Sequence, residues 1–158
     1  MRLRRNGSGS GLLALTGPNG TSAWAGRPFR VKGSRSRADD LVMAQILVID
    51  DDPRVLRYAS LLLQFEGHRV RTESTYADGL AAITETDFDV VLVDVRLGAT
   101  SGLDLLAAAR RSGLLRGVRV VLHTSEPWDE ICTDADRLGL ADFVAKPAEP
   151  RSLLRAVA

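Results

Sequence analysis

The sequence predicts an α/β fold: a doubly wound, five-stranded parallel sheet with helices on both faces, preceded by an N-terminal extension. Two observations predict it. From residue 44 onward, five short apolar segments alternate with segments whose apolar residues recur at helical spacing, a pattern typical of βαβ crossovers and a parallel sheet. In the first, third and fourth apolar segments the run is nearly continuous, as expected for central strands buried on both sides.

The first strand–helix unit begins with the apolar, β-branched run at residues 45–49. Pro53 suits the first position of a helix, and the Asp52 side chain can cap the N–H groups exposed there. The helix can end at Gly67, because glycine is the usual residue just past a helix C-terminus. Its apolar residues recur at helical spacing: Val55, Leu56, Ala59, Leu62 and Leu63.

The second unit is less apolar than the first. Val70 and Thr72 alternate with charged residues, which predicts a strand with one covered face. A helix can begin after Thr75, and we expect Leu80, Ala81 and either Ile83 or Thr84 to face inward. The remaining elements are predicted as strand, helix, strand, helix, strand and short helix, at residues 89–93, 103–111, 118–123, 129–138, 141–145 and 151–157.

The N-terminal extension, residues 1–42, differs in charge and composition from residues 43–158. It has eight Lys or Arg and two Asp, a net charge of +6, whereas the rest has thirteen basic and eighteen acidic residues, a net charge of −5. Because it lacks sustained apolar periodicity, we expect it to be disordered. Alternatives are a twin-arginine export signal, a transit peptide, or a basic arm touching nucleic acid or membrane. A start codon assigned too far upstream of Met43 would also explain the extension.

Bulk composition limits the class of protein. The longest apolar runs are far shorter than the roughly 18 residues of a membrane span, so we expect no membrane association. Cys132 is the single cysteine, so an intrachain disulfide cannot form, which fits a cytoplasmic protein.

Polar residues follow the predicted strands at the points where they end. Asp50 and Asp51 follow the first strand, Asp94 the third, Thr124 the fourth and Lys146 the fifth. In an open doubly wound sheet, ligands bind at the carboxyl ends of the strands. We therefore expect these side chains to form one site.

This set of residues favours phosphoryl chemistry. Clustered carboxylates repel one another unless a cation neutralises them, and Mg²⁺ prefers such oxygen ligands. A carboxylate beside the metal can attack a phosphoryl donor, with a hydroxyl and an ammonium binding the phosphoryl oxygens. Only Lys32 and Lys146 are lysines, against nineteen arginines, so the lysine at a strand end favours a functional role.

Three segments together resemble the receiver domains of response regulators. Residues 46–53 resemble the first strand and its acidic pair, residues 91–97 the phosphoacceptor strand and loop, and residues 144–147 the lysine–proline signature. The resemblance covers nearly all of residues 44–158. It implies a flavodoxin-like (βα)₅ fold in a two-component signalling protein, with Asp94 phosphorylated by a sensor histidine kinase or a histidine phosphotransfer protein.

The resemblance also implies roles for the site residues. Asp51, Asp94 and the backbone carbonyl of Arg96 would hold Mg²⁺, and Asp50 would reach the metal through water. The remaining roles concern switching: Thr124 is the switch hydroxyl, Phe143 the switch aromatic residue, and Lys146 the partner of the phosphoryl group.

Three features depart from the family pattern, and one, the peptide bond after Lys146, is expected to follow it. Gly98 stands where the family usually has proline, and Ser101 where an acid or Asn often precedes the glycine. Lys146 and Pro147 would be joined by a cis peptide. The last helix ends early, at Ala158, and in the family this helix often forms part of the dimer or partner face.

The expected function is a stand-alone signalling module rather than an enzyme, because only twelve residues follow Lys146 and none forms an output domain. It would act on a protein partner without binding nucleic acid directly. The sequence leaves open whether the domain forms a homodimer. One alternative is a degenerate receiver that acts only as a binding scaffold. The other is a haloacid-dehalogenase-like phosphatase that uses Asp50 and Asp52 as nucleophile and acid.

Overall fold

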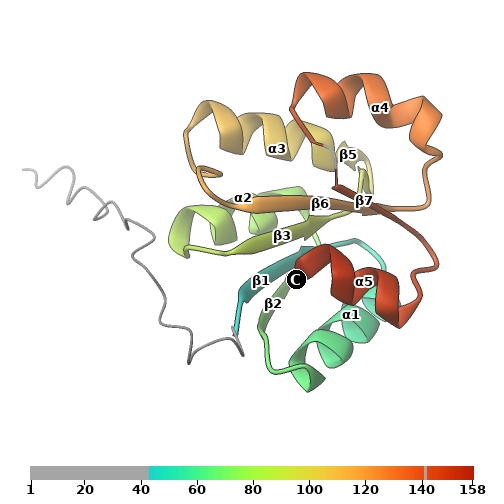
Figure 1. Cartoon of the computed structure of the whole chain (residues 1–158). Helices are drawn as coiled ribbons and strands as arrows, with labels where there is room; N and C mark the ends of the chain where they lie inside the picture. Colours follow the sequence, from blue (N-terminus) through green and yellow to red (C-terminus); the bar gives the residue numbers. More distant parts are fainter. Residues whose placement is uncertain (1–42, 141) are drawn as a thin grey trace, which may run out of the picture. The chain divides into compact units, whose positions relative to one another are not determined.

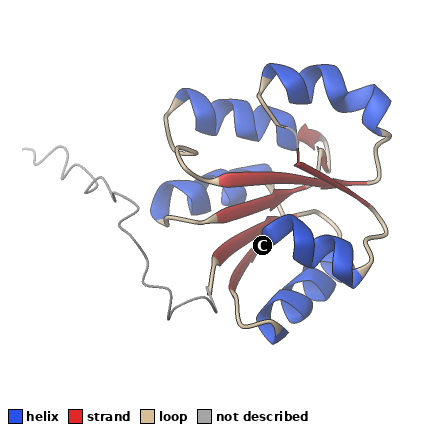
Figure 2. Ribbon diagram, in the orientation of Figure 1, coloured by secondary structure: helices blue, strands red, loops and turns tan. Residues whose placement is uncertain are grey.

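The computed structural model describes residues 43–140 and 142–158. The predicted disordered extension, residues 1–42, lies outside the described residues. Figures 1 and 2 show a central sheet between two layers of helices. The predicted α/β class, with its five-stranded parallel sheet, is confirmed.

The sheet has the strand order β2-β1-β3-β6-β7, and every neighbouring pair is parallel. The chain first adds β2 on one side of β1 and then continues with β3 on the other side. The point where the strand order reverses therefore lies between β1 and β3, at whose carboxyl ends ligands bind in such folds. The strands are β1 (Gln45–Ile49), β2 (Arg69–Glu73), β3 (Val90–Val93), β6 (Arg119–Thr124) and β7 (Asp142–Ala145).

Helices cover both faces of the sheet. The helices are α1 (Pro53–Phe65), α2 (Tyr76–Glu85), α3 (Gly102–Arg111), α4 (Trp128–Arg137) and α5 (Pro150–Val157). Figure 1 shows α1 and α5 together on one face and α3 and α4 on the other. Among the described residues, no helix combines the length and the apolar character that crossing a bilayer requires.

Each face of the sheet has its own apolar core, because successive side chains of a strand point to opposite faces. Leu47 and Val91 belong to the core under α2, α3 and α4, whereas Val48 and Leu92 belong to the core under α1 and α5. All four are at most 1% exposed. The nearly continuous apolar runs in the sequence arise from this two-sided burial.

The predicted helix starts agree with the structure at two positions. Asp52 caps α1, and its side chain accepts a hydrogen bond from the N–H of Arg54 at 2.8 Å. Thr75 caps α2, and its hydroxyl accepts from the N–H of Asp78 at 3.1 Å. Gly67, at the predicted end of the first helix, has the left-handed φ of +88° that glycine adopts most easily.

Other expectations require correction. In α2, Ile83 is buried and Leu80 packs against the core as expected, but Ala81 and Thr84 are exposed, and the buried residues of the helix are Gly79, Ala82 and Ile83. The loop expected after Asp94 contains a short hairpin of β4 (Arg96–Leu97) and β5 (Thr100–Ser101). The fifth strand begins at Asp142, and residue 141, which was expected to open it, lies outside the described residues.

Candidate functional site

The site lies where β1, β3 and β7 end. The hydrogen-bonded ladder continues one residue past β3, because the N–H of Asp94 donates to the carbonyl of Ile49 at 2.9 Å. The N–H of Lys146 likewise donates to the carbonyl of Thr124 at 2.9 Å. The sheet therefore fixes the backbone of Asp94 and Lys146, which carry two of the charged side chains.

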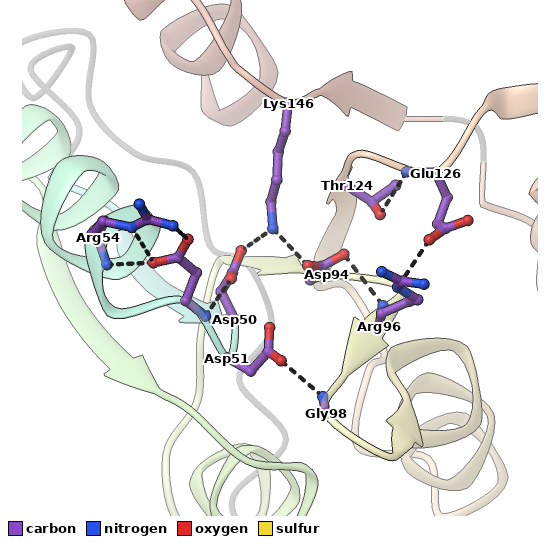
Figure 3. A network of polar contacts seen from close by, with 10 residues as sticks. Asp50, Asp51, Arg54, Asp94, Arg96, Gly98, Thr124, Glu126 and Lys146 are labelled. Carbon is purple, nitrogen blue, oxygen red and sulfur yellow. Dashed lines mark hydrogen bonds and ion pairs between the residues drawn. The ribbon is translucent and has the colours of Figure 1, made fainter.

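Lys146 joins the two buried acids of the site. Its Nζ donates to Oδ2 of Asp94 at 2.6 Å and forms an ion pair with Oδ2 of Asp50. Figure 3 shows the lysine side chain extending to both carboxylates from the end of β7. The side chains of Asp50 and Asp94 are 1% and 8% exposed, so these contacts are poorly screened by solvent.

Burial and pairing act in opposite directions on the charges of this pair. Desolvation by burial raises the pKa of Asp50, and the hydrogen bonds from Lys146 and from the N–H of Asp52 only partly offset it. Burial also disfavours the charged form of Lys146, but hydrogen bonds to Asp50 and Asp94 outweigh that effect and raise its pKa. Lys146 is therefore a firmly protonated ammonium.

Three carboxylates form a cluster suited to a metal ion. One oxygen from each of Asp50, Asp51 and Asp94 lies within 4.8 Å of the others. Such a set of hard oxygen donors fits Mg²⁺ or Ca²⁺ and does not suit metals that prefer sulfur or imidazole. The cluster lines an open cleft of about 320 Å³, together with Lys146 and residues of the neighbouring loops.

Arg96, whose backbone carbonyl was a predicted metal ligand, belongs to the loop that follows β3. Its N–H points at Oδ1 of Asp94, at 3.3 Å. Its guanidinium Nε forms an ion pair with Oε1 of Glu126 at 3.0 Å, and this contact crosses from the loop after β3 to the loop after β6 (Figure 3). Arg96 thus lies at the edge of the cleft.

Asp52 also lines the cleft but does not belong to the cluster of three carboxylates. Its oxygens accept hydrogen bonds from the backbone N–H and the guanidinium of Arg54, and these bonds lower the pKa of Asp52 to about 2. An acid–base role needs a carboxyl that is protonated near neutral pH, which is the opposite shift. The geometry supports the helix cap and gives no support to the phosphatase alternative.

Neither of the two expected switch residues is among the residues that line the cleft. Thr124 is fully buried at the end of β6, and its Oγ1 accepts from the N–H of Glu126 at 3.2 Å. Phe143 of β7 stacks against Trp128 at the start of α4, with ring centroids 5.3 Å apart and tilted by 51°. The structure brings together Asp50, Asp51, Asp94 and Lys146, whereas Phe143 contacts the aromatic ring of α4 instead.

The predicted cis peptide between Lys146 and Pro147 is confirmed. It lies directly after β7, at the residue whose side chain enters the cleft.

Sequence reasoning missed three neighbours of the site. Glu126 pairs with Arg96, the N–H of Gly98 donates to Oδ2 of Asp51 at 3.0 Å, and His123 is buried beside Thr124. Glu126 could have been noticed as a charge two residues beyond a strand end. The contact of Gly98 had no sequence signal, because it uses only the backbone.

His123 is an unpaired polar side chain in the core. It is 3% exposed, and neither ring nitrogen has a hydrogen-bond partner among the described residues. Burial, and then the positive charge of Lys146, lower the pKa of His123 to about 4, against an opposing effect of Asp94. The imidazole is therefore neutral at physiological pH.

Comparisons with known proteins agree with this geometry. The family described as response regulator receiver domain matches residues 46–158. The alginate biosynthesis transcriptional regulatory protein AlgB of Pseudomonas putida is 34% identical over 114 residues, which cover 72% of this chain and 25% of that protein. The chain thus spans about a quarter of the length of this relative.

Two solved structures show the same fold. The chemotaxis response regulator CheY4 of Vibrio cholerae has a TM-score of 0.68 and 26% identity, and the match covers 73% of this chain and 97% of that one. A response regulator protein from Burkholderia pseudomallei, solved with a phosphorylated aspartic acid and a calcium ion, has a TM-score of 0.66 and 28% identity over 73% of this chain and 66% of that one. The sequence match, the strand order and the structural likeness agree, and the chain belongs to the response regulator receiver domain family.

Proposed function

We propose that residues 43–158 form a phosphoacceptor domain in which Asp94 receives a phosphoryl group, with Mg²⁺ bound beside it, in the cytoplasm. The donor would be the phosphohistidine of a sensor histidine kinase or of a histidine phosphotransfer protein. The observation that carries this proposal is the position of the Asp94 carboxylate, which contacts the ammonium of Lys146 and lies within 4.8 Å of carboxylate oxygens of Asp50 and Asp51.

The proposed step is a displacement at phosphorus. A carboxylate oxygen of Asp94 attacks, a new O–P bond forms, and the bond from phosphorus to the imidazole nitrogen of the donor breaks with its electron pair left on that nitrogen. Asp51, Asp94 and the backbone carbonyl of Arg96 would hold Mg²⁺, and Asp50 would reach it through water. The metal would supply positive charge to the transferring oxygens. Lys146, already in contact with Asp94, would donate to a phosphoryl oxygen.

The phosphorylated state would be transmitted through Thr124 and Phe143. In the present structure the Thr124 hydroxyl is engaged by the N–H of Glu126. We propose that this hydroxyl turns to the phosphoryl group, and that Phe143 then changes its packing against Trp128. Such a change would reach the surface of α4, since Trp128 is 37% exposed.

We propose that the output is binding to a protein partner, which could be a second copy of the chain. The net charge of −5 over residues 43–158 favours a protein over a nucleic acid as the direct partner, because the phosphates of nucleic acid repel an acidic domain. The relative AlgB is a transcriptional regulator, and its additional length leaves room for other segments. The proposal that the receiver acts without an output domain therefore applies only to the residues of this sequence.

The experiment that tests the proposal is incubation with acetyl phosphate or beryllofluoride, with and without Mg²⁺. Acetyl phosphate should add the mass of one phosphoryl group only when Mg²⁺ is present, and Asp94→Asn should abolish the gain. Asp134→Asn, an exposed position on α4 that pairs with Arg137, is the matched control and should be phosphorylated normally.

The other outcomes separate the alternatives. A phosphoryl group that persists in Asp94→Asn and vanishes in Asp50→Asn would support the phosphatase chemistry. A protein that takes up neither phosphoryl nor beryllofluoride, although it is folded and binds Mg²⁺, would be the degenerate scaffold.

A further inference from the structure

The β4–β5 hairpin contacts the carboxylate cluster through two backbone groups, the N–H of Arg96 at Asp94 and the N–H of Gly98 at Asp51. The N–H of Gly98, at the tip of the hairpin, donates to Oδ2 of Asp51 at 3.0 Å. Figure 3 shows this contact at the side of the cleft opposite Lys146. The Asp51 side chain is otherwise at the exposed edge of the cluster, because Asp51 is the one exposed residue of the three.

The hairpin is anchored well enough to hold that N–H in place. Leu97 is 4% exposed and packs in the core, and its carbonyl accepts from the hydroxyl of Thr100 at 2.7 Å. Arg96 pairs with Ser101 across the hairpin, and the N–H of Gly102 donates to the carbonyl of Val95 at 2.8 Å. The tip is therefore fixed relative to the end of β3.

The conformation at the tip needs a residue such as glycine that also retains its N–H. Gly98 has a φ of +60°, in the left-handed region. Proline cannot reproduce this arrangement, because its ring fixes φ near −65° and it has no N–H to donate. Space is not the constraint, since a Cβ at this position meets no atom within 4 Å.

We propose that the N–H of Gly98 is an outer-shell donor that orients Asp51 for the divalent cation. The hydrogen bond engages one carboxylate oxygen and so directs the other to the metal. Groups that orient metal-ligating carboxylates commonly change metal affinity by about 10-fold to 100-fold. The inference rests on the proposed function for the identity of the cation and concerns metal binding rather than phosphorylation.

By linkage, the effect is reciprocal. If the hairpin favours the metal-bound position of Asp51, the bound metal must equally favour the hairpin conformation that donates to Asp51. Mg²⁺ should therefore reduce the opening of the Gly98 amide to solvent, in addition to any effect on the acids themselves.

The first test is calorimetric titration of the full chain with Mg²⁺. Gly98→Pro should weaken Mg²⁺ binding about 10-fold, because the outer-shell donor is lost. Gly98→Asn is the matched control: asparagine keeps the N–H and tolerates a left-handed φ, so its affinity should stay within about threefold of wild type. Equal affinities of the wild type and Gly98→Pro, both with native circular dichroism, would overturn the inference.

The second test uses the unaltered chain and so does not depend on the folding of a variant. In nitrogen-15 spectra, hydrogen exchange of the Gly98 amide should slow at least threefold on saturation with Mg²⁺, and the slowing should vanish in Asp51→Asn. An amide that exchanges equally fast with and without Mg²⁺ overturns the inference. If the two tests succeed while Asp94 is not phosphorylated, the inference stands and the proposed function fails. If phosphorylation depends on Mg²⁺ but Gly98→Pro binds Mg²⁺ as tightly as the wild type, the proposed function stands and the inference fails.

Discussion

At the scale of single residues, Lys146 balances the charges of the site. Its ammonium contacts two carboxylates that are almost completely buried, and its own side chain is 14% exposed. Removing one partner of such a buried pair leaves an uncompensated charge, at a cost of about 3–5 kcal/mol. The lysine thus contributes to the stability of the metal-free domain as well as to the proposed binding of the phosphoryl group.

Lys146→Arg tests whether the site requires a compact ammonium. The guanidinium is planar and larger, and it cannot contact both Asp50 and Asp94 from the same backbone position without displacing them. We expect the beryllofluoride-induced change in Trp fluorescence to fall at least tenfold. The control is Arg151→Lys, an exposed exchange at the start of α5, which should leave the change intact. An undiminished response in Lys146→Arg would show that the space is not limiting.

His123 predicts how stability depends on pH. Its pKa is about 4 in the folded chain and near 6.5 when unfolded, so below about pH 6.5 the unfolded state binds more protons. Stability should therefore be complete above pH 6.5 and fall as the pH drops towards 4, by at most about 1.4 kcal/mol per pH unit. Urea unfolding of the wild type and of His123→Leu measures this contribution.

The comparison between the two proteins isolates His123 from the acids. The raised pKa of Asp50 has the opposite effect on stability, since it favours the folded state as the pH falls. Because Asp50 is present in both proteins, its effect cancels in the comparison. Parallel stability curves for the wild type and His123→Leu between pH 4 and 6.5 would contradict the prediction.

At the scale of elements, two loops are joined beside Asp94. The ion pair of Arg96 and Glu126 connects the loop after β3 to the loop after β6. Because the Arg96 side chain is 76% exposed, the pair itself should contribute less than about 1 kcal/mol to stability. Its effect should appear instead in the electrostatic field at the cleft, since Glu126 neutralises a cation that an anionic donor would meet.

Glu126→Gln should therefore speed phosphorylation by acetyl phosphate. An unpaired guanidinium at the cleft edge attracts the anionic donor, and we expect the rate at low ionic strength to rise by about two- to fivefold and the gain to shrink in 0.5 M salt. Glu130→Gln makes the same change of charge on the exposed surface of α4 and should give a smaller increase. Equal rates in both variants would mean that net charge, and not the ion pair, governs the reaction.

The start of α3 packs closely against the backbone at the end of β3. A Cβ on Gly102 would lie 1.9 Å from the carbonyl oxygen of Asp94, which is backbone and cannot move aside. We expect Gly102→Ala to destabilise the domain by about 3 kcal/mol in urea unfolding, at the upper end of overpacking effects. Gly79→Ala is the contrast, because its Cβ would meet the end of the Ile49 side chain at 2.8 Å and alanine favours a helix interior. Similar losses in both variants would contradict the steric explanation.

The elements differ in how far the sequence could predict them. The strands at Gln45–Ile49 and Val90–Val93 were recognisable because burial on both faces requires a continuous apolar run. The hairpin of β4 and β5 was not, since two-residue strands have no detectable period. The error at Ala81 has a similar origin: α2 has apolar residues around more than one face, and the choice between them depends on which neighbours pack there.

The same distinction holds for the candidate site. The acids and Lys146 were predictable because a parallel sheet gathers its strand ends at one edge. The contacts of Gly98 and Glu126 depend instead on how two loops fold over that edge, and the backbone donor of Gly98 leaves no trace in side-chain chemistry.

At the scale of the whole molecule, the layered architecture concentrates charge at one edge. Both faces of the sheet are covered by helices, so the polar ends of the strands can meet only at the edges between the layers. Asp50, Asp51 and Asp94 carry three negative charges there against one positive charge on Lys146. The domain therefore keeps a net negative charge in the cleft that a divalent cation would relieve.

Mg²⁺ should consequently stabilise the folded domain, because it binds the assembled cluster and not the separated acids of the unfolded chain. At a concentration tenfold above its dissociation constant, the stabilisation is about 1.4 kcal/mol, or roughly 4–6 °C in the midpoint of thermal unfolding for a domain of this size. Asp51→Asn should remove most of that shift, yet raise or preserve the midpoint without metal, since it deletes one of the repelling charges. Sodium chloride at matched ionic strength controls for simple screening. A Mg²⁺ shift of equal size in Asp51→Asn, or in the wild type with sodium chloride alone, would place the cation outside this cluster.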